Sequence, residues 1–240
     1  MTSVHPRALV IIPTFNEGDR FVSLMDTFPA QRAYDVLVVD DGSTDDALAR
    51  ADLSGVSVIR HEENRGVGAS LRDGILFARR HGYDIVVIMA GNGKMSPSEI
   101  PALLQPILDS KADYVQGSRF LDGGQSANLP RGRRLAIRWL TRLTNLLLGF
   151  RGTDVTCGFR AYRLSLLDDP EIDIEQDWLD CYELEYYLHI KVIRGGYRVV
   201  EVPVSMTYPR EKRNYSKIRP FVGWWSILKP WFCLSLGLKH

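Results

Sequence analysis

Five short apolar runs, separated by stretches with helical spacing, constrain the fold of this chain more than any other feature of its sequence. The runs cover residues 8–12, 36–39, 56–59, 85–89 and, more weakly, 114–116. Runs that are apolar throughout, rather than at every second residue, indicate strands buried on both faces. Such strands alternating with helices are typical of a parallel sheet with right-handed crossovers. We therefore predict an α/β fold with a mostly parallel, Rossmann-like sheet flanked by helices.

Four stretches between and after these runs have the spacing of helices. Residues 21–28 and 67–78 carry apolar side chains three and four positions apart, and residues 131–150 and 179–193 predict two further helices in the second half. No linker divides the chain, and 240 residues suit one α/β domain. We therefore expect a single domain.

The C-terminal segment, residues 218–240, is apolar and rich in tryptophan, and we separate it from a domain at residues 1–217. Charged residues and prolines interrupt it, whereas a membrane-spanning helix needs about 20 mostly apolar residues. Two interpretations stay open. The segment packs on the domain, or it anchors the protein in a membrane interface, where tryptophans suit the headgroup layer. The tryptophans are Trp224, Trp225 and Trp231.

Polar or glycine-rich residues follow each of the five apolar runs. Because open parallel sheets bind ligands beyond the carboxyl ends of their strands, five such loops on one edge predict a binding site. Carboxylates such as Glu17 and Asp41 can accept hydrogen bonds from a nucleobase or a ribose. Either one, taken singly, can equally cap a helix or a turn. The pattern as a whole therefore favours a nucleotide site.

Charge, cysteine content and missing motifs disfavour several classes of protein. A net charge of +1 and the lack of a recognition motif argue against nucleic-acid binding. Three widely spaced cysteines without a CxxC pattern predict a reduced chain without structural zinc. The first seven residues have no apolar signal region, so we expect a cytoplasmic protein. The absence of GxxxxGK[ST], and of GxGxxG after the first run, disfavours P-loop phosphotransferases and dinucleotide oxidoreductases.

Two motifs carry a resemblance to a known family. Residues 10–17 (VIIPTFNE) resemble the opening of the inverting family 2 glycosyltransferases, and residues 38–45 (VVDDGSTD) resemble their second motif. Residues 117–120 (GSRF), 154–160 (DVTCGFR) and 201–204 (EVPV) resemble the branch of dolichol-phosphate mannose synthases and bacterial polyprenyl-phosphate relatives. The resemblance extends over nearly the whole chain.

The resemblance implies a GT-A fold and the inverting transfer of a sugar from a nucleoside-diphosphate sugar. In this branch the acceptor is often a lipid phosphate, so the resemblance also implies a peripheral protein at the cytosolic membrane face. It places the donor across the strand ends, with the base near the first two loops and the diphosphate near the fourth. The residues assigned to the donor are Pro13, Phe15, Glu17, Asp41, Gly91, Asn92 and Lys94.

One departure from the family concerns the metal ion. In the family, an Asp-x-Asp motif after the fourth strand holds a divalent cation on the donor diphosphate, whereas residues 90–92 of this chain are Ala-Gly-Asn. Asn92 offers one neutral carbonyl oxygen, a weak ligand for Mg2+ or Mn2+. Lys94 can instead place a positive charge near the diphosphate, or it can be an exposed loop lysine. A requirement for Mg2+ or Mn2+ therefore stays open.

Two basic clusters, residues 131–142 and 210–219, favour the binding of anions, either a membrane surface or a phosphate. The simpler explanation for any single arginine is a solvated surface. The residues assigned to an acceptor phosphate are Arg119, Arg134, Arg210 and Lys217.

The catalytic candidates are Asp154, Glu185 and Arg119. A hydroxyl acceptor needs a general base, for which Asp154 and Glu185 are suited, whereas an ionised phosphate needs none. Asp154 can also cap a turn, and Glu185 can be an ordinary surface residue of a helix.

Two rival functions stay open. Loss of both carboxylates at residues 90–92 can mark a non-catalytic subunit that keeps the fold and binds a partner or a membrane. A nucleotidyltransferase also places nucleotides on such a sheet. The intact motifs at the other strand ends favour the glycosyltransferase.

Overall fold

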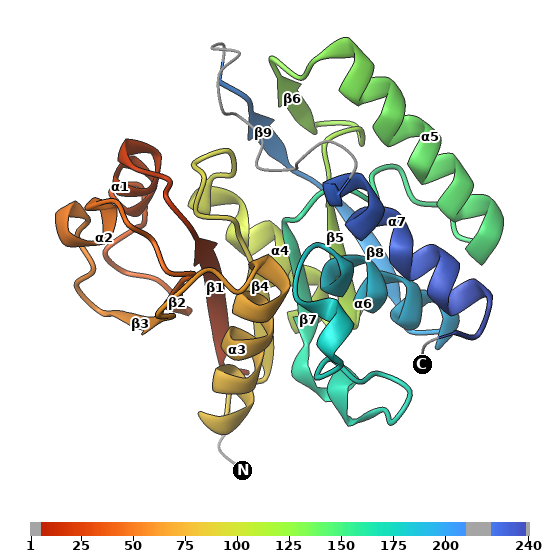
Figure 1. The fold of residues 1–240 in the computed structure, drawn as a ribbon, viewed down its shortest axis with the longest axis horizontal. Coiled ribbons are helices and arrows are strands. Elements are labelled where there is room, and N and C mark those ends of the chain that lie inside the picture. The colour runs from red at the N-terminus through yellow and green to blue at the C-terminus, as the bar shows by residue number, and fades with distance from the viewer. Residues whose placement is uncertain (1–5, 210–221, 239–240) are drawn as a thin grey trace.

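The computed structural model describes residues 6–209 and 222–238, which are built around a seven-stranded sheet of order β3-β2-β1-β4-β7-β5-β8 (Figure 1). All neighbouring strands are parallel except β7, which runs antiparallel between β4 and β5. The strands are β1 (Ala8–Thr14), β2 (Asp35–Asp40), β3 (Val56–Arg60), β4 (Ile85–Ile88), β5 (Tyr114–Ser118), β7 (Arg160–Arg163) and β8 (Val199–Pro203). The sheet confirms the predicted fold class.

Two hydrophobic clusters cover the two faces of this sheet. Val10 and Ile12 of β1 pack in one cluster, and Leu9 and Ile11 pack in the other, because alternate residues of a strand point to opposite faces. The first face is covered by α1 (Asp19–Met25), α2 (Ala47–Arg50) and α4 (Ile100–Leu108), and the second by α3 (Val67–Arg80), α6 (Glu183–Arg194) and α7 (Val222–Ser235). Burial on both faces explains the unbroken apolar run of β1.

The third apolar run does not follow this rule. β3 is an edge strand, and Val58 is 43% exposed. The expectation that this strand is buried on both faces is therefore wrong, because a strand with one neighbour has less of the molecule around it. β7 was not predicted as a strand, since four residues with two arginines carry little apolar pattern.

A second, smaller sheet stands beside the large one. It pairs β6 (Gln125–Ala127) in parallel with β9 (Ser205–Thr207), and the long helix α5 (Arg131–Leu148) follows β6 along the outside of the molecule (Figure 1). The predicted helix at residues 131–150 is thereby confirmed. Short 3-10 helices complete the described residues: η1 (Pro97–Glu99), η2 (Leu164–Asp168) and η3 (Asp177–Leu179).

The C-terminal helix α7 packs on the domain through one side. Ile227 and Trp231 are each 5% exposed and lie in the second cluster, whereas Trp225 and Phe232 stack on each other in the open at 56% and 51% exposure. Within residues 6–209 and 222–238, no helix combines the length and the apolar character needed to cross a membrane. The proposed boundary between residues 217 and 218 lies outside the described residues.

His189 of α6 is a buried histidine whose protonation links the stability of the core to pH. Its ring is fully buried beside Tyr114 and Phe150, and neither nitrogen has a hydrogen-bond partner among the described residues. Burial, with Arg160 adding to it, lowers the pKa of His189 well below the ordinary value of 6.5. The imidazole therefore stays neutral in the folded chain, while the unfolded chain takes up a proton below that pH.

We expect the free energy of unfolding to fall as the pH drops below about 6.5, by up to ~1.4 kcal/mol per pH unit from this site. A His189→Leu variant should lose that part of the slope in urea unfolding measured between about pH 7.5 and 5. The exposed His81 provides the control, because His81→Gln should keep the slope. An unchanged slope in His189→Leu would contradict the assignment.

Candidate active site

The loops after β1 and β2 are tied together at the carboxyl edge of the sheet. Asn16 Oδ1 accepts hydrogen bonds from the backbone N–H groups of Thr44 and Asp45 at 2.8 and 3.2 Å. The N–H of Asn16 donates to Ser43 Oγ at 3.0 Å, and that of Gly18 donates to Asp45 Oδ2 at 2.9 Å. Asn16 has φ 47°, a left-handed conformation that asparagine tolerates better than most residues. The two loops therefore form one hydrogen-bonded wall, which includes the predicted donor residues from Pro13 to Glu17.

Asp41 holds the loop that follows β3. Its carboxylate lies 2.8 Å from His61 Nδ1 and accepts hydrogen bonds from Asn64 Nδ2 at 2.8 Å and from the N–H groups of Arg65 and Gly66 at 2.8 and 2.9 Å. Asp41 is only 4% exposed. It therefore positions residues 61–66 at the edge of the site. A contact between Asp41 and a nucleobase stays a prediction.

The loop after β4 closes against the end of β1. A Cβ atom on Gly91 would lie 2.9 Å from Cβ of Thr14, so a larger residue would push the loop away. Asn92 Oδ1 accepts a hydrogen bond from the N–H of Lys94 at 3.2 Å, and the carbonyl oxygen of Lys94 accepts one from Thr207 at 3.0 Å. These bonds place Gly91, Asn92 and Lys94 between the β1 loop and β9.

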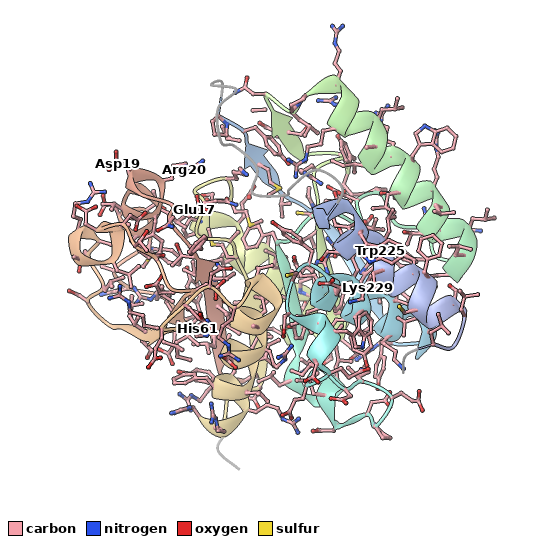
Figure 2. All side chains as sticks on the ribbon, in the orientation of Figure 1. Glu17, Asp19, Arg20, His61, Trp225 and Lys229 are labelled. Carbon is pink, nitrogen blue, oxygen red and sulfur yellow. The ribbon has the colours of Figure 1, made fainter. Side chains whose placement is uncertain are left out.

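The two halves of the chain meet around Tyr182. Burial, together with the nearby charge of Glu185, raises the pKa of Tyr182 to about 12, with smaller effects from Arg133, which lowers it, and Glu17, which raises it. Glu17 also pairs with Arg20 at 3.1 Å, with only 10% of its own side chain exposed (Figure 2). One phenol therefore lies within electrostatic reach of the β1 loop, α5 and α6.

Arg119 and Asp154 form a buried bidentate ion pair. Nε and Nη2 of Arg119 donate to the two carboxylate oxygens at 2.6 and 2.8 Å, and the residues are 4% and 0% exposed. Arg119 also donates to the hydroxyl oxygens of Thr156, at 2.6 Å, and Tyr208. Burial opposes the charge of Arg119, but the Asp154 carboxylate outweighs that effect, so the pKa of Arg119 lies above its ordinary value. Arg119 thereby fixes the ring of Tyr208 in place.

The two candidate general bases differ in access. Both oxygens of Asp154 already accept hydrogen bonds from Arg119, and the residue is 0% exposed. Glu185 is half-buried, and its Oε1 would lie 3.1 Å from a Cβ atom on Gly158, in the loop before β7. Glu185 is therefore the more accessible of the two carboxylates. A catalytic role for either carboxylate stays a prediction.

Two further cations gather around the ring of Tyr208, which is 2% exposed. Lys94 Nζ lies 5.7 Å from the ring centroid, and Arg133 Cζ lies 5.6 Å from it. Cations at such distances are attracted by the negative face of an aromatic ring. Tyr208 therefore gathers side chains from the β4 loop, from α5 and, through its hydroxyl, from Arg119.

The remaining predicted phosphate ligands are Arg134, Arg210 and Lys217. Arg134 is exposed and donates to Ser126 Oγ at 3.2 Å, on the side of α5 that faces β6. Arg210 and Lys217 lie outside the described residues, so their role stays a prediction.

Comparisons with known proteins agree with this geometry. The family model "Glycosyl transferase family 2" matches residues 9–170. The polyprenol monophosphomannose synthase of Mycolicibacterium smegmatis is 34% identical over 208 residues, covering 84% of this chain and 77% of that protein. The undecaprenyl-phosphate mannosyltransferase of Micrococcus luteus is 35% identical over 210 residues, covering 83% of each. This chain belongs to the family 2 glycosyltransferases.

The fold of this glycosyltransferase also has a solved relative. Glucosyl-3-phosphoglycerate synthase from Mycobacterium tuberculosis, in complex with Mn2+, UDP and phosphoglyceric acid, matches with a TM-score of 0.70. The match covers 94% of this chain and 78% of that chain, at 20% sequence identity. It supports the GT-A fold that the motifs implied.

The residues after β4 of this glycosyltransferase do not fit a divalent cation. Asn92 supplies one amide oxygen, which already accepts the hydrogen bond from Lys94, and neither Ala90 nor Gly91 has a ligand atom in its side chain. Among the described residues, no group of three or more His, Cys, Asp and Glu side chains is arranged to hold a metal ion. Mg2+ and Mn2+ prefer several oxygen ligands, and carboxylates above all.

Three residues of this site were not singled out from the sequence of the glycosyltransferase. They are His61, Tyr182 and Tyr208. His61 directly follows β3, two residues after the third apolar run, and was therefore detectable by the rule that located the other loops. Tyr182 precedes α6, and Tyr208 follows β9. The sequence around each tyrosine does not indicate which charged side chains lie near it.

Proposed function

We propose that this glycosyltransferase transfers a sugar, with inversion, from a nucleoside-diphosphate sugar to a lipid phosphate at a membrane surface. One observation carries the proposal: Lys94 of the β4 loop and Arg133 of α5 lie within 6 Å of the centroid of the same Tyr208 ring, on the side of the sheet where the loops after β1 and β2 are tied together. The names of the relatives from Mycolicibacterium and Micrococcus support a polyprenyl phosphate as acceptor.

The chemistry of such a transfer suits the residues present. The acceptor oxygen forms a bond to the anomeric carbon from the face opposite the diphosphate, while the bond from that carbon to the diphosphate oxygen breaks. A phosphate acceptor is already ionised and needs no base, which agrees with an Asp154 carboxylate fully engaged by Arg119. The leaving diphosphate gains negative charge and needs positive groups near it, and Lys94 and Arg133 are suited to that task.

Incubation of the purified protein with nucleotide sugars and undecaprenyl phosphate tests the proposal directly. We expect release of a nucleoside diphosphate and formation of a glycosylated lipid, with inverted configuration at the anomeric carbon by NMR. Release of free pyrophosphate would point to a nucleotidyltransferase instead. Neither binding nor turnover of any nucleotide sugar would point to a non-catalytic subunit.

The outer face of α5 supports the membrane part of the proposal. Leu135, Trp139, Leu143 and Leu146 recur three or four residues apart, and Trp139 and Leu146 are 62% and 81% exposed. Arginines at 131, 134, 138 and 142 accompany this apolar stripe on the same helix. An apolar stripe flanked by arginines is suited to the interface of an anionic membrane.

A double variant, Trp139→Ser with Leu146→Glu, should therefore bind vesicles of phosphatidylglycerol and phosphatidylcholine about tenfold or more weakly than the wild type. Co-sedimentation measures the bound fraction. Leu108→Glu on α4 serves as the control, because Leu108 is 45% exposed but lies on another helix, under the opposite sheet face from α7. Equal binding by the double variant and the wild type would refute this surface.

A further inference from the structure

Three carboxylates at the carboxyl edge of the sheet are already engaged by other groups of the protein. Asp41 binds the loop of residues 61–66, Asp154 binds Arg119, and Glu17 pairs with Arg20. Residues 90–92 contribute only Asn92, whose side-chain oxygen accepts a hydrogen bond from its own loop. These three carboxylates therefore bind other parts of the protein rather than surround a metal position.

Positive side chains stand at the same edge instead. Lys94 comes from the β4 loop itself, and Arg133 comes from the first turn of α5. Both are half-buried, and both lie within 6 Å of the centroid of the Tyr208 ring. Two cations from distant parts of the chain are thus brought to one place at the rim.

Tyr208 is itself held through its backbone and its hydroxyl group. Its hydroxyl oxygen accepts a hydrogen bond from Arg119, its N–H donates to the carbonyl oxygen of Ala127 at 3.0 Å, and its carbonyl oxygen accepts from Asn128 Nδ2 at 3.1 Å. A fixed ring limits the positions that the Lys94 and Arg133 side chains adopt. The positive charge of Arg119 is neutralised by Asp154.

We propose that Lys94 and Arg133, ordered by Tyr208, bind the donor diphosphate directly, so that this glycosyltransferase binds its nucleotide without a divalent cation. The proposal rests on the proposed function, since it takes the donor to be a nucleoside-diphosphate sugar. A lysine supplies a compact charge and an arginine supplies paired N–H donors, and both are common ligands of phosphate oxygens.

Calorimetric titration of the wild type with UDP, GDP and dTDP, each in EDTA and again in MnCl2 or MgCl2, tests the proposal. We expect one nucleotide to bind in EDTA, with an affinity that either metal changes less than about threefold. Binding that appears only with Mn2+ or Mg2+ would overturn the metal-independent site and leave the proposed function standing. No binding under any condition would overturn both.

Substitutions then test the two cations. Lys94→Met and Arg133→Met should each weaken binding of the nucleoside diphosphate about tenfold or more in EDTA, because each removes a charge-assisted contact. Binding of the matching nucleoside monophosphate should change less, since it has no β-phosphate. Lys94→Arg, which keeps the charge, should recover part of the affinity.

Matched controls separate this effect from a general loss of charge. Lys111→Met and Arg80→Met remove the same charges from exposed positions on other elements and should leave the affinity unchanged. Thermal melting of each unliganded variant confirms that it is folded before titration. Equal affinities of Lys94→Met, Arg133→Met and the wild type would overturn the proposal.

Discussion

Replacing Arg119 with methionine should lower the free energy of unfolding by about 3–5 kcal/mol, because it leaves the Asp154 carboxylate buried without its partner. Asp154 is 0% exposed, and both of its oxygens accept hydrogen bonds from Arg119. Tyr208 would lose its hydroxyl contact at the same time. Urea unfolding measures the change, and the linear dependence on urea gives the free energy.

Three comparison variants make this result specific. Arg119→Lys keeps a charge but not the two paired hydrogen bonds, so its loss of unfolding free energy should lie between those of the wild type and Arg119→Met. Arg119→Met combined with Asp154→Asn removes both charges and should recover part of the stability. Arg131→Met, at an exposed position of α5, should be near neutral. A loss below about 1 kcal/mol in Arg119→Met would show that the pair behaves like a surface salt bridge.

Asp41→Ala should cost about 2–4 kcal/mol of unfolding free energy, because it leaves several donors of residues 61–66 without an acceptor. The carboxylate now binds two backbone N–H groups as well as the side chains of His61 and Asn64. Loosening this loop also disturbs the wall beside the proposed nucleotide site. We therefore expect nucleotide affinity to fall about tenfold or more, as measured by calorimetric titration.

The loss in Asp41→Ala can be separated from a general effect of removing a carboxylate. Asp122→Ala removes an exposed carboxylate from the loop after β5. It should leave the free energy of unfolding and the nucleotide affinity unchanged. Asp41→Asn keeps an acceptor of the same size and should lie between Asp41→Ala and the wild type. If Asp41→Ala keeps full stability, Asp41 does not organise residues 61–66.

Much of the fold could be predicted because strands buried on both faces are apolar throughout, and such runs are visible in the sequence. β1, β2 and β4 are central strands with apolar side chains on both faces, and their runs indicated them directly. β3 has a similar run, but its place at the edge depends on strand order, which a single run does not contain. β7 is four residues long and includes Arg160 and Arg163, so no pattern distinguished it from a loop.

The loops at the carboxyl edge of the sheet were predicted in their position more than in their contacts, and the donor site there stays a prediction. The loops after β1, β2 and β4 were assigned to one edge because parallel strands end together, and the structure ties the first two loops to each other through Asn16. The engagement of Asp154 by Arg119 could not be predicted, because the two residues are 35 positions apart and meet only when β7 enters the sheet. The cations around Tyr208 depend on tertiary packing in the same way.

The reversed direction of β7 decides which of its ends lies at the carboxyl edge of the parallel strands. Ile88, the last residue of β4, lies opposite Arg160, the first residue of β7. The chain therefore enters β7 at the carboxyl edge of the parallel strands and leaves it at their amino edge. For the parallel strands, the predicted site residues come after the strand. For β7, the predicted site residue Asp154 comes before it, as does Gly158 beside Glu185. In chains of this kind, a search for functional residues should therefore include the residues that precede any strand antiparallel to its neighbours.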